Sequence, residues 1–280
     1  MALRVYFDGS GKEEIDPVIT VGGFFADAAL CETIEDEWEA ATGGKVFHLA
    51  DFGTNKCQLG SGKWDSARRV EFLKRLAAIV NRPGCKIVSA SIEVAQYSSF
   101  IAKSPHAHVN GPAFSGCAQA CVTGTELLIN ALGRWREHVA YVFELGDRQH
   151  ELHKMFSDWI DTRSSLNGLR GISFEPKQTA LLQPADLIAG IVQKCVKAAH
   201  SALPCLEGGK SRTFLDVFEH HYSEDGVTSA VVSGHDRDGC CIINPKSFSV
   251  LDSTSTNFFE RHPEVLKKRL RQSPYKPKKT

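Results

Sequence analysis

Residues 3–11 and 17–25 read LRVYFDGSG and PVITVGGFF, and these two stretches decide the fold. Both are rich in Val, Ile, Phe and Tyr, which favour strands, and the connection between them is polar. We therefore expect strands over Leu3–Phe7 and Pro17–Phe25, paired as a hairpin. The turn Asp8-Gly9-Ser10-Gly11 ends the first strand and places a carboxylate at its carboxyl end.

Beyond the hairpin, helix-type and strand-type patterns alternate along the chain. Apolar residues recur every three to four positions in the predicted helices and every second position in the predicted strands. This order favours an α/β fold with a mixed central β-sheet flanked by helices. The predicted helices cover 28–41, 63–80, 113–135, 151–160 and 183–199, and the predicted strands cover 46–49, 85–94, 138–145 and 172–174. Weaker patterns predict a helix over 214–221 and a strand over 240–243.

Charge is balanced over the whole chain but uneven along it. Lys and Arg number 33, as do Asp and Glu, so the net charge is zero. This balance argues against a protein coated with positive charge. Seven basic residues and no acid lie between Lys267 and Lys279, which leaves the rest of the chain mildly acidic. A basic tail on an acidic body suits nucleic-acid binding, and the alternative is a solubilising terminus.

The sequence indicates a cytoplasmic protein with reduced thiols. The amino terminus leads directly into a strand and lacks a charged head followed by an apolar core, and no run of eighteen apolar residues predicts a membrane span. The nine cysteines include no CxxC pair, which makes a structural zinc site improbable on spacing. A thiol-based redox function is an alternative, but it needs a Cys of low pKa, and no motif indicates one.

Three acids stand at positions where chemistry is often found. Asp8 follows a strand and adjoins glycines that let a ligand approach the backbone. Glu144 ends the apolar strand in VFELGDR, and Asp186 lies near the start of the apolar helix QPADLIAGIVQKC. We expect Asp186 in the first helical turn, where the helix dipole favours an ionised carboxylate. Small residues on its helix face, Ala189 and Gly190, would leave room for a metal or phosphate.

Each acid also has a purely structural interpretation. Asp8 can form an Asx turn. Glu144 can pair with Arg148, four positions later. Asp186 can stabilise the start of its helix without binding a ligand.

Taken together, the motifs resemble the DUF3800 family. The resemblance is carried by the YFDGSG turn, VGGFF, FHLADF (residues 47–52), VFELGDR and LLQPADLIAG (residues 181–190), which cover residues 3–195 in the family's order. The family usually has an aspartate-rich DESG-type turn after its first strand, so Gly9 stands where Glu is usual. This departure leaves Asp8 and Ser10 in place.

The resemblance implies a ribonuclease H-like fold with Asp8, Glu144 and Asp186 as its catalytic acidic cluster. Carboxylate oxygens suit Mg²⁺ or Mn²⁺ better than zinc. Two such ions activate water and stabilise the leaving oxygen in phosphodiester hydrolysis. We therefore expect a ribonuclease H-like domain over 3–200, a C-terminal extension over 201–265 packed on it and a flexible basic tail over 266–280.

Six further residues are secondary candidates for the same site. His48 and Asp51 match the family's middle segment and would orient water or add a ligand; alternatively they are a loop His and an N-cap Asp. Glu93, in the predicted strand SASIEV, points either into the site or to solvent by strand alternation. The remaining candidates are Ser10 in the first turn, Asp147 as a replacement for Glu144, and Lys177 as a phosphate contact.

The function that these observations favour is a divalent-metal-dependent nuclease or phosphodiesterase with DNA or RNA as substrate. The alternative is a non-catalytic module on the same fold that binds nucleic acid or protein, an interpretation motivated by the basic tail and by Gly9.

Overall fold

The hairpin predicted at the amino terminus forms the centre of the sheet. In the computed structural model, which describes residues 2–95, 97–98, 112–146, 148–164, 170–201 and 229–231, β1 (Ala2–Ser10) pairs antiparallel with β2 (Val18–Asp27). Nine of the ten residues of β2 are buried, because helices cover both faces of the sheet at this strand. The register sets Phe7 opposite Gly23 and Asp8 opposite Gly22.

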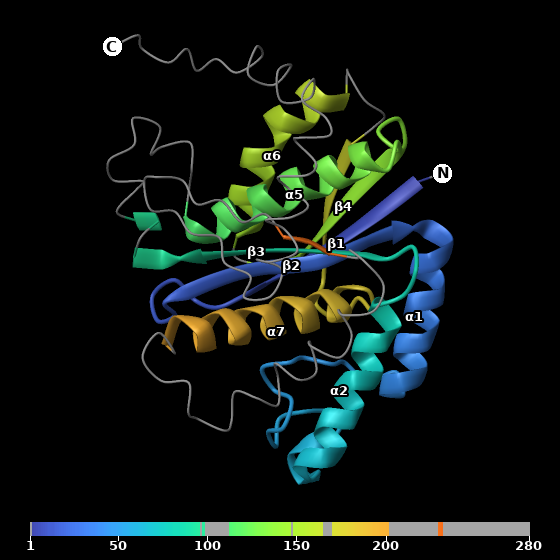
Figure 1. Ribbon diagram of the computed structural model, residues 1–280, viewed down its shortest axis with the longest axis vertical. Helices are drawn as coiled ribbons and strands as arrows, with labels where there is room; N and C mark the ends of the chain where they lie inside the picture. The colour runs from blue at the N-terminus through green and yellow to red at the C-terminus, as the bar shows by residue number, and fades with distance from the viewer. Residues whose placement is uncertain are drawn as a thin grey trace.

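Six strands form one mixed sheet in the order β5-β4-β1-β2-β3-β6 (Figure 1). β4 and β5 run parallel to β1 on one side, whereas β2 and β3 continue the antiparallel meander on the other. The remaining strands are β3 (Lys86–Glu93), β4 (His138–Glu144), β5 (Arg170–Glu175) and β6 (Ser229–Val231). The helices are α1 (Ala28–Thr42), α2 (Ser66–Val80), α5 (Ala113–Ala131), α6 (Gln149–Ser164) and α7 (Leu182–Ser201).

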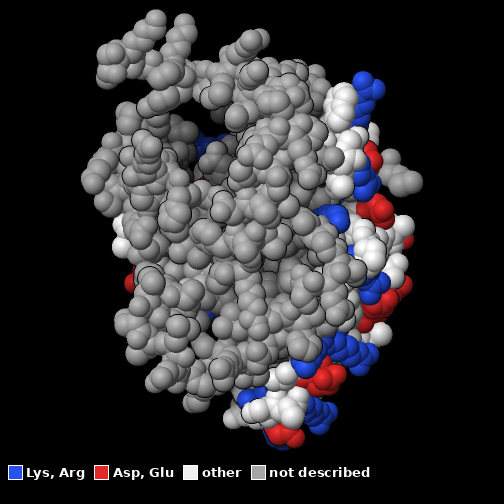
Figure 2. All heavy atoms as spheres, in the orientation of Figure 1, with Lys and Arg blue, Asp and Glu red and all other residues white. Residues whose placement is uncertain are grey.

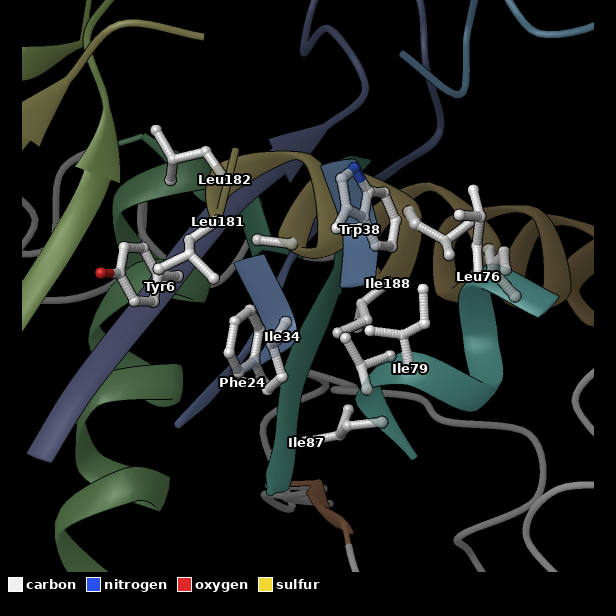
Figure 3. Packing of buried hydrophobic residues seen from close by; sticks show 14 of the residues in the cluster. Tyr6, Phe24, Ile34, Trp38, Leu76, Ile79, Ile87, Leu181, Leu182 and Ile188 are labelled. Atoms are coloured by element: carbon white, nitrogen blue, oxygen red, sulfur yellow. The ribbon is translucent and has the colours of Figure 1, made fainter. Parts of the chain in front are cut away.

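Helices cover the sheet on both faces, which confirms a layered α/β fold. α7 lies on one face with α1 and α2 beside it, and α5 and α6 lie on the other face (Figure 1). Each face has its own apolar cluster. In the α7 layer, Tyr6 and Phe24 from the sheet meet Ile34 and Trp38 of α1 and Ile188 of α7 (Figure 3).

α7 approaches the sheet so closely that glycine is needed beneath it. A Cβ atom on Gly22 would lie 2.9 Å from the Cα of Ala189, and one on Gly190 would lie 2.5 Å from a methyl group of Leu49. The expectation that Ala189 and Gly190 leave space for a ligand beside Asp186 is therefore wrong. These small residues serve helix packing, because strand β2 and the segment that contains Leu49 fill the space.

The segment 46–49, predicted as a strand, is instead an irregular loop. Its apolar side chains Phe47 and Leu49 are buried, which explains the strand-like pattern. The N–H of Phe47 donates to Gln183 Oε1 at 2.8 Å, and that of Leu49 donates to Asp186 Oδ2 at 2.6 Å. Side chains of α7 thus take the backbone donors that a neighbouring strand would otherwise satisfy.

Element boundaries shift where a cap intervenes. The helix expected over 63–80 begins only at Ser66, because Asp65 caps it by accepting from the N–H of Arg68. The helix expected over 113–135 ends at Ala131, and Gly133 follows with a φ of 72°. The strand β6 was not expected from the sequence. The elements predicted over 214–221 and 240–243 and the basic tail lie outside the described residues. Of the extension expected over 201–265, the structure describes only Ser201 and the residues of β6.

A buried ion pair ties α5 to the edge of the sheet. The guanidinium of Arg170 on β5 donates to both carboxylate oxygens of Glu126 on α5, at 2.7 and 3.2 Å, and the hydroxyl of Tyr141 on β4 donates to the same carboxylate at 2.6 Å. Glu126 and Arg170 are each about 4% exposed. A fully hydrogen-bonded arrangement of this kind offsets the cost of removing two charges from water.

Charge on the visible described surface is mixed. Figure 2 shows basic and acidic side chains interspersed along the edge where α1 and α2 lie. No helix in the described ranges combines the length and the apolar content that a bilayer crossing needs.

Candidate functional site

The parallel pairing of β1 with β4 brings two of the predicted acids together. Phe7 and Phe143 are partners in the register, so the next residues along, Asp8 and Glu144, lie at the same edge of the sheet. Asp8 is only 5% exposed, and Glu144 is one of the neighbours that raise the pKa of its carboxyl group. The strand pairing thus brings two carboxyl groups together where Asp8 has little contact with water.

Asp186 reaches the same region from the helix layer. Its carboxylate is 7% exposed and accepts the hydrogen bond from the N–H of Leu49 through Oδ2. Asp186 is the fifth residue of α7, so it lies in the second turn of the helix. The expectation of a first-turn acid is therefore wrong, because the helix begins at Leu182, before the predicted Gln183.

Burial and mutual repulsion disfavour charge on Asp8. Loss of hydration raises the pKa of Asp8 well above its usual value, and the neighbouring Glu144 and Asp186 raise it further. The N–H of Gly9 donates to Asp8 Oδ1 at 2.6 Å and acts in the opposite direction.

The pKa of Asp186 is raised as well, and loss of hydration is the largest cause. His48, the N–H of Leu49 and Lys177 partly counter this effect, while Glu144 adds to it. Burial therefore outweighs any benefit from the helix dipole. Asp8 and Asp186 are thus two buried acids with too little positive charge around them to favour the ionised carboxylates.

Two secondary candidates form a chain of contacts that ends at Asp186. The Nδ1 atom of His48 lies 3.2 Å from Asp51 Oδ2, and its Nε2 atom lies 3.6 Å from Asp186 Oδ1. Asp51 lies in a turn and caps none of the described helices. The His48 ring thus bridges two acids and is held beside the cluster.

Lys177 also reaches the cluster. Its Nζ atom lies 3.8 Å from Glu144 Oε1, at the limit of an ion pair. The alternative pairing of Glu144 with Arg148 is wrong, because Arg148 donates to Glu13 at 2.8 Å. The chain turns after β5 and brings Lys177 next to Glu144, although the two residues are far apart in the sequence.

The structure shows different things for the other secondary candidates. Ser10 donates to Gln193 Oε1 at 2.8 Å, and Gln193 also donates to the carbonyl of Val18, so Ser10 helps to fasten α7 to the hairpin. In the sheet register, Glu93 stands opposite Val18, four residues along β2 from the partner of Asp8, which places its backbone roughly 13 Å further along the sheet. Asp147 lies outside the described residues.

A pocket of about 520 Å³ adjoins the Asp8–Glu144 pair. Gly9, Lys12, Phe114 and Arg148 also line it. The sequence analysis did not identify Lys12, Glu13 or Phe114 as site residues. Lys12 and Glu13 directly follow the Asp8 turn, so their position in the sequence could have indicated them as site residues. Phe114 lies in α5, and only the tertiary structure brings it to the pocket.

In the described residues, no group of three or more His, Cys, Asp or Glu side chains is arranged so that it could hold a metal ion. The three acids approach one another without forming a closed ligand set. Asp8 and Asp186 each have one oxygen fixed by a backbone N–H, and the second oxygen of Asp186 lies 3.6 Å from His48 Nε2.

The thiols whose side chains the structure describes are poor candidates for chemistry. Cys31, Cys57, Cys85, Cys117 and Cys121 are all buried. Burial raises the pKa of Cys31 and of Cys85 to about 12, the opposite of what a reactive thiolate needs.

Comparison with known proteins adds little to this geometry. No protein-family model matches the sequence, and no curated protein matches it. A chain in the structure of the PCNA:RNase HII complex from Archaeoglobus fulgidus is 12% identical to this one and superposes with a TM-score of 0.38, covering 78% of this chain and 87% of that chain. A superposition this loose assigns neither a fold family nor an activity, so the case for the site rests on its own residues.

Proposed function

We propose that this protein is a divalent-metal-dependent nuclease or phosphodiesterase with a ribonuclease H-like fold. The observation that carries the proposal is the meeting of Asp8 and Glu144 at one sheet edge, with Asp186 close enough to raise the pKa of Asp8. Buried acids that repel one another cost stability, and such costs are typical of functional sites.

The strand order supports the ribonuclease H-like part of the proposal. In that fold, the first three strands form an antiparallel meander. Two further strands lie on the other side of the first strand and run parallel to it. The sheet has this pattern, with β3-β2-β1 antiparallel and β1-β4-β5 parallel. The resemblance to the DUF3800 family implied the same fold and stays a prediction.

The donor chemistry fits Mg²⁺ or Mn²⁺. Asp8, Glu144 and Asp186 would hold the ion through hard carboxylate oxygens. A bound cation would compensate the charge that now raises the pKa of the two aspartates. Because the described acids do not yet form a closed ligand set, binding would be accompanied by side-chain adjustment. When bound, such ions activate water and neutralise charge on the phosphodiester.

The surrounding residues would orient the reactants. His48, held by Asp51, would position the Asp186 carboxylate and a water molecule beside it. Lys177, 3.8 Å from Glu144, would contact a non-bridging phosphate oxygen. Neither residue is required to supply a metal ligand.

Cleavage of labelled DNA and RNA oligonucleotides in Mg²⁺ or Mn²⁺ tests the proposal. We expect Asp8→Asn and Asp186→Asn to reduce cleavage by at least a hundredfold, because each removes a charged ligand with little change in shape. Asp36→Asn, on the exposed side of α1, is the matched control and keeps wild-type activity. Cleavage that survives in both site variants would show that these acids are not the catalytic site.

A second candidate is a non-catalytic nucleic-acid- or protein-binding module on the same fold. The observation that favours it is the absence, in the described residues, of a ligand set already closed around a metal position. It predicts binding of an oligonucleotide without turnover in any divalent cation. Deletion of residues 267–280 would then weaken binding most at low salt.

A further inference from the structure

The pocket beside the acidic pair contains positive charge that the carboxylate cluster does not use. Lys12 and Arg148 line it together with Asp8, Glu144 and Glu14. The acids alone would repel a phosphate, so any phosphate that enters this pocket needs a cation to bind it. Arg148 is the better placed of the two cations because other residues hold its side chain in position.

Glu13 and Phe114 hold the Arg148 guanidinium from two directions. Its Nη1 donates to Glu13 Oε1 at 2.8 Å, and its central carbon lies 4.6 Å from the centre of the Phe114 ring. The same Glu13 oxygen accepts the N–H of Phe114 at 2.9 Å, so one carboxylate fixes both the cation and the ring. Fixing a guanidinium before binding reduces the entropy lost when it meets a ligand.

The guanidinium keeps donors for a ligand. It has five N–H groups, and the bond to Glu13 uses one of them. The Arg148 side chain is 29% exposed and lines the pocket, so part of it faces the space beside Asp8 and Glu144. A planar group with several donors matches the oxygens of a phosphate better than a lysine does.

Gly9 makes this arrangement possible. A Cβ atom there would lie 2.2 Å from Phe114 Cε2, so any side chain at position 9 would displace the ring. Without the ring, the guanidinium would lose the aromatic face on which it lies. Glycine at position 9, where the resembled family usually has Glu, is thus required by the Phe114–Arg148 contact.

We propose that Arg148 binds a backbone phosphate of a nucleic-acid strand, next to the phosphodiester at the Asp8–Glu144 pair. This inference rests on the proposed function, which identifies the ligand as a nucleic acid. The inference itself concerns binding and not cleavage. Arg148 is then a substrate-binding residue, and Lys12 adds a second positive charge at the pocket.

Binding of a fluorescent single-stranded oligonucleotide, measured by anisotropy in EDTA over a salt series, tests the inference without turnover. We expect Arg148→Gln to weaken binding about tenfold and to reduce the slope of log Kd against log salt by about 0.7, the loss of one phosphate contact. Arg82→Gln is the matched control, because Arg82, just after the end of α2, is also a half-buried arginine paired with a glutamate, Glu37 of α1. It keeps wild-type binding.

Glu13→Gln is expected to change the affinity for the oligonucleotide in the opposite direction. The amide oxygen can still accept from Arg148 and Phe114, but the negative charge beside the guanidinium is lost. We expect binding to become severalfold tighter, which a variant that merely disturbed the fold would not show. A methylphosphonate oligomer, which lacks backbone charge, should bind equally to wild type and Arg148→Gln.

Equal binding by Arg148→Gln and Arg82→Gln overturns the inference, as does a wild-type protein that binds no oligonucleotide at low salt. Binding that depends on Arg148, together with no cleavage in any divalent cation, supports the inference and counts against the nuclease. Cleavage lost in Asp8→Asn but unaffected by Arg148→Gln, with unchanged Kd, supports the nuclease and removes the phosphate contact.

Discussion

The backbone N–H of Leu49 donates a 2.6 Å hydrogen bond to Asp186 Oδ2, and both residues are buried. This bond joins the loop that carries His48 to helix α7 and fixes one oxygen of the candidate ligand. It also satisfies a buried backbone donor of the loop, so the segment around Leu49 needs no neighbouring strand.

The Leu49 bond predicts different results for two substitutions of Asp186. Asp186→Asn keeps an acceptor for the buried N–H, so its free energy of unfolding at pH 8 stays equal to or above that of wild type. Asp186→Leu leaves the donor unsatisfied and is expected to cost about 1–3 kcal/mol. Urea denaturation in EDTA measures both. Equal stability of the two variants would mean that the bond contributes little.

The raised pKa of Asp8 predicts that stability falls with pH. Between the usual Asp value of 3.8 and the higher folded value, the native state binds more protons than the unfolded state, so the free energy of unfolding decreases as pH rises. Each pKa unit is equivalent to about 1.4 kcal/mol. We expect a smaller decrease between pH 4 and pH 8 in Asp8→Asn than in wild type, measured by denaturation in EDTA.

Asp36→Asn serves as the control for this pH series and should follow the wild-type curve, since Asp36 is exposed on α1. If the free energy of unfolding decreases with pH as much in Asp8→Asn as in wild type, other groups cause the pH dependence.

The buried pair of Glu126 and Arg170 predicts a large loss of stability when one partner is removed. Glu126→Ala leaves the Arg170 guanidinium, which is about 4% exposed, without the carboxylate that accepts from it and from Tyr141. The expected cost is about 3–5 kcal/mol. Glu126→Gln, which retains an acceptor, should cost less. Thermal denaturation distinguishes them, and a cost below about 1 kcal/mol for Glu126→Ala would be inconsistent with a buried charge.

The close packing of α7 on β2 predicts that Gly22→Ala is destabilising. The new methyl group would lie 2.9 Å from the Cα of Ala189, so the helix must shift, at a cost of about 1–3 kcal/mol. Gly171→Ala on β5 is the matched control, because nothing lies within 4 Å of its added Cβ. Similar melting temperatures for the two variants would show that α7 adjusts freely.

Local sequence patterns predicted most of the fold. The hairpin 3–11 and 17–25, the five helices and the strands expected over 85–94, 138–145 and 172–174 are found close to their expected positions, because apolar periodicity and turn residues are local signals. The segment 46–49 was misassigned, because its burial depends on α7 and not on strand pairing. Asp8 and Glu144 were predictable from strand ends, since parallel strands end at one edge.

Contacts between distant parts of the chain could not be read from local spacing. Arg148 follows Glu144 so closely that an ion pair was a reasonable interpretation, yet its partner Glu13 lies 135 positions away. Phe114 joins the site through α5, and no pattern in its own segment indicates this. Lys177 stays a predicted phosphate contact, and the turn after β5 brings its Nζ atom within 3.8 Å of Glu144 Oε1.

Calorimetric titration of Mn²⁺ tests the central claim most directly. The titration is made into wild type, Asp8→Asn and Asp36→Asn, each with and without an uncleavable phosphorothioate oligonucleotide that can supply missing ligands. We predict saturable binding to wild type and Asp36→Asn, and an affinity at least tenfold weaker in Asp8→Asn. Equal affinities in all three proteins, or no binding to wild type even with the oligonucleotide, would contradict a metal site built on Asp8, Glu144 and Asp186.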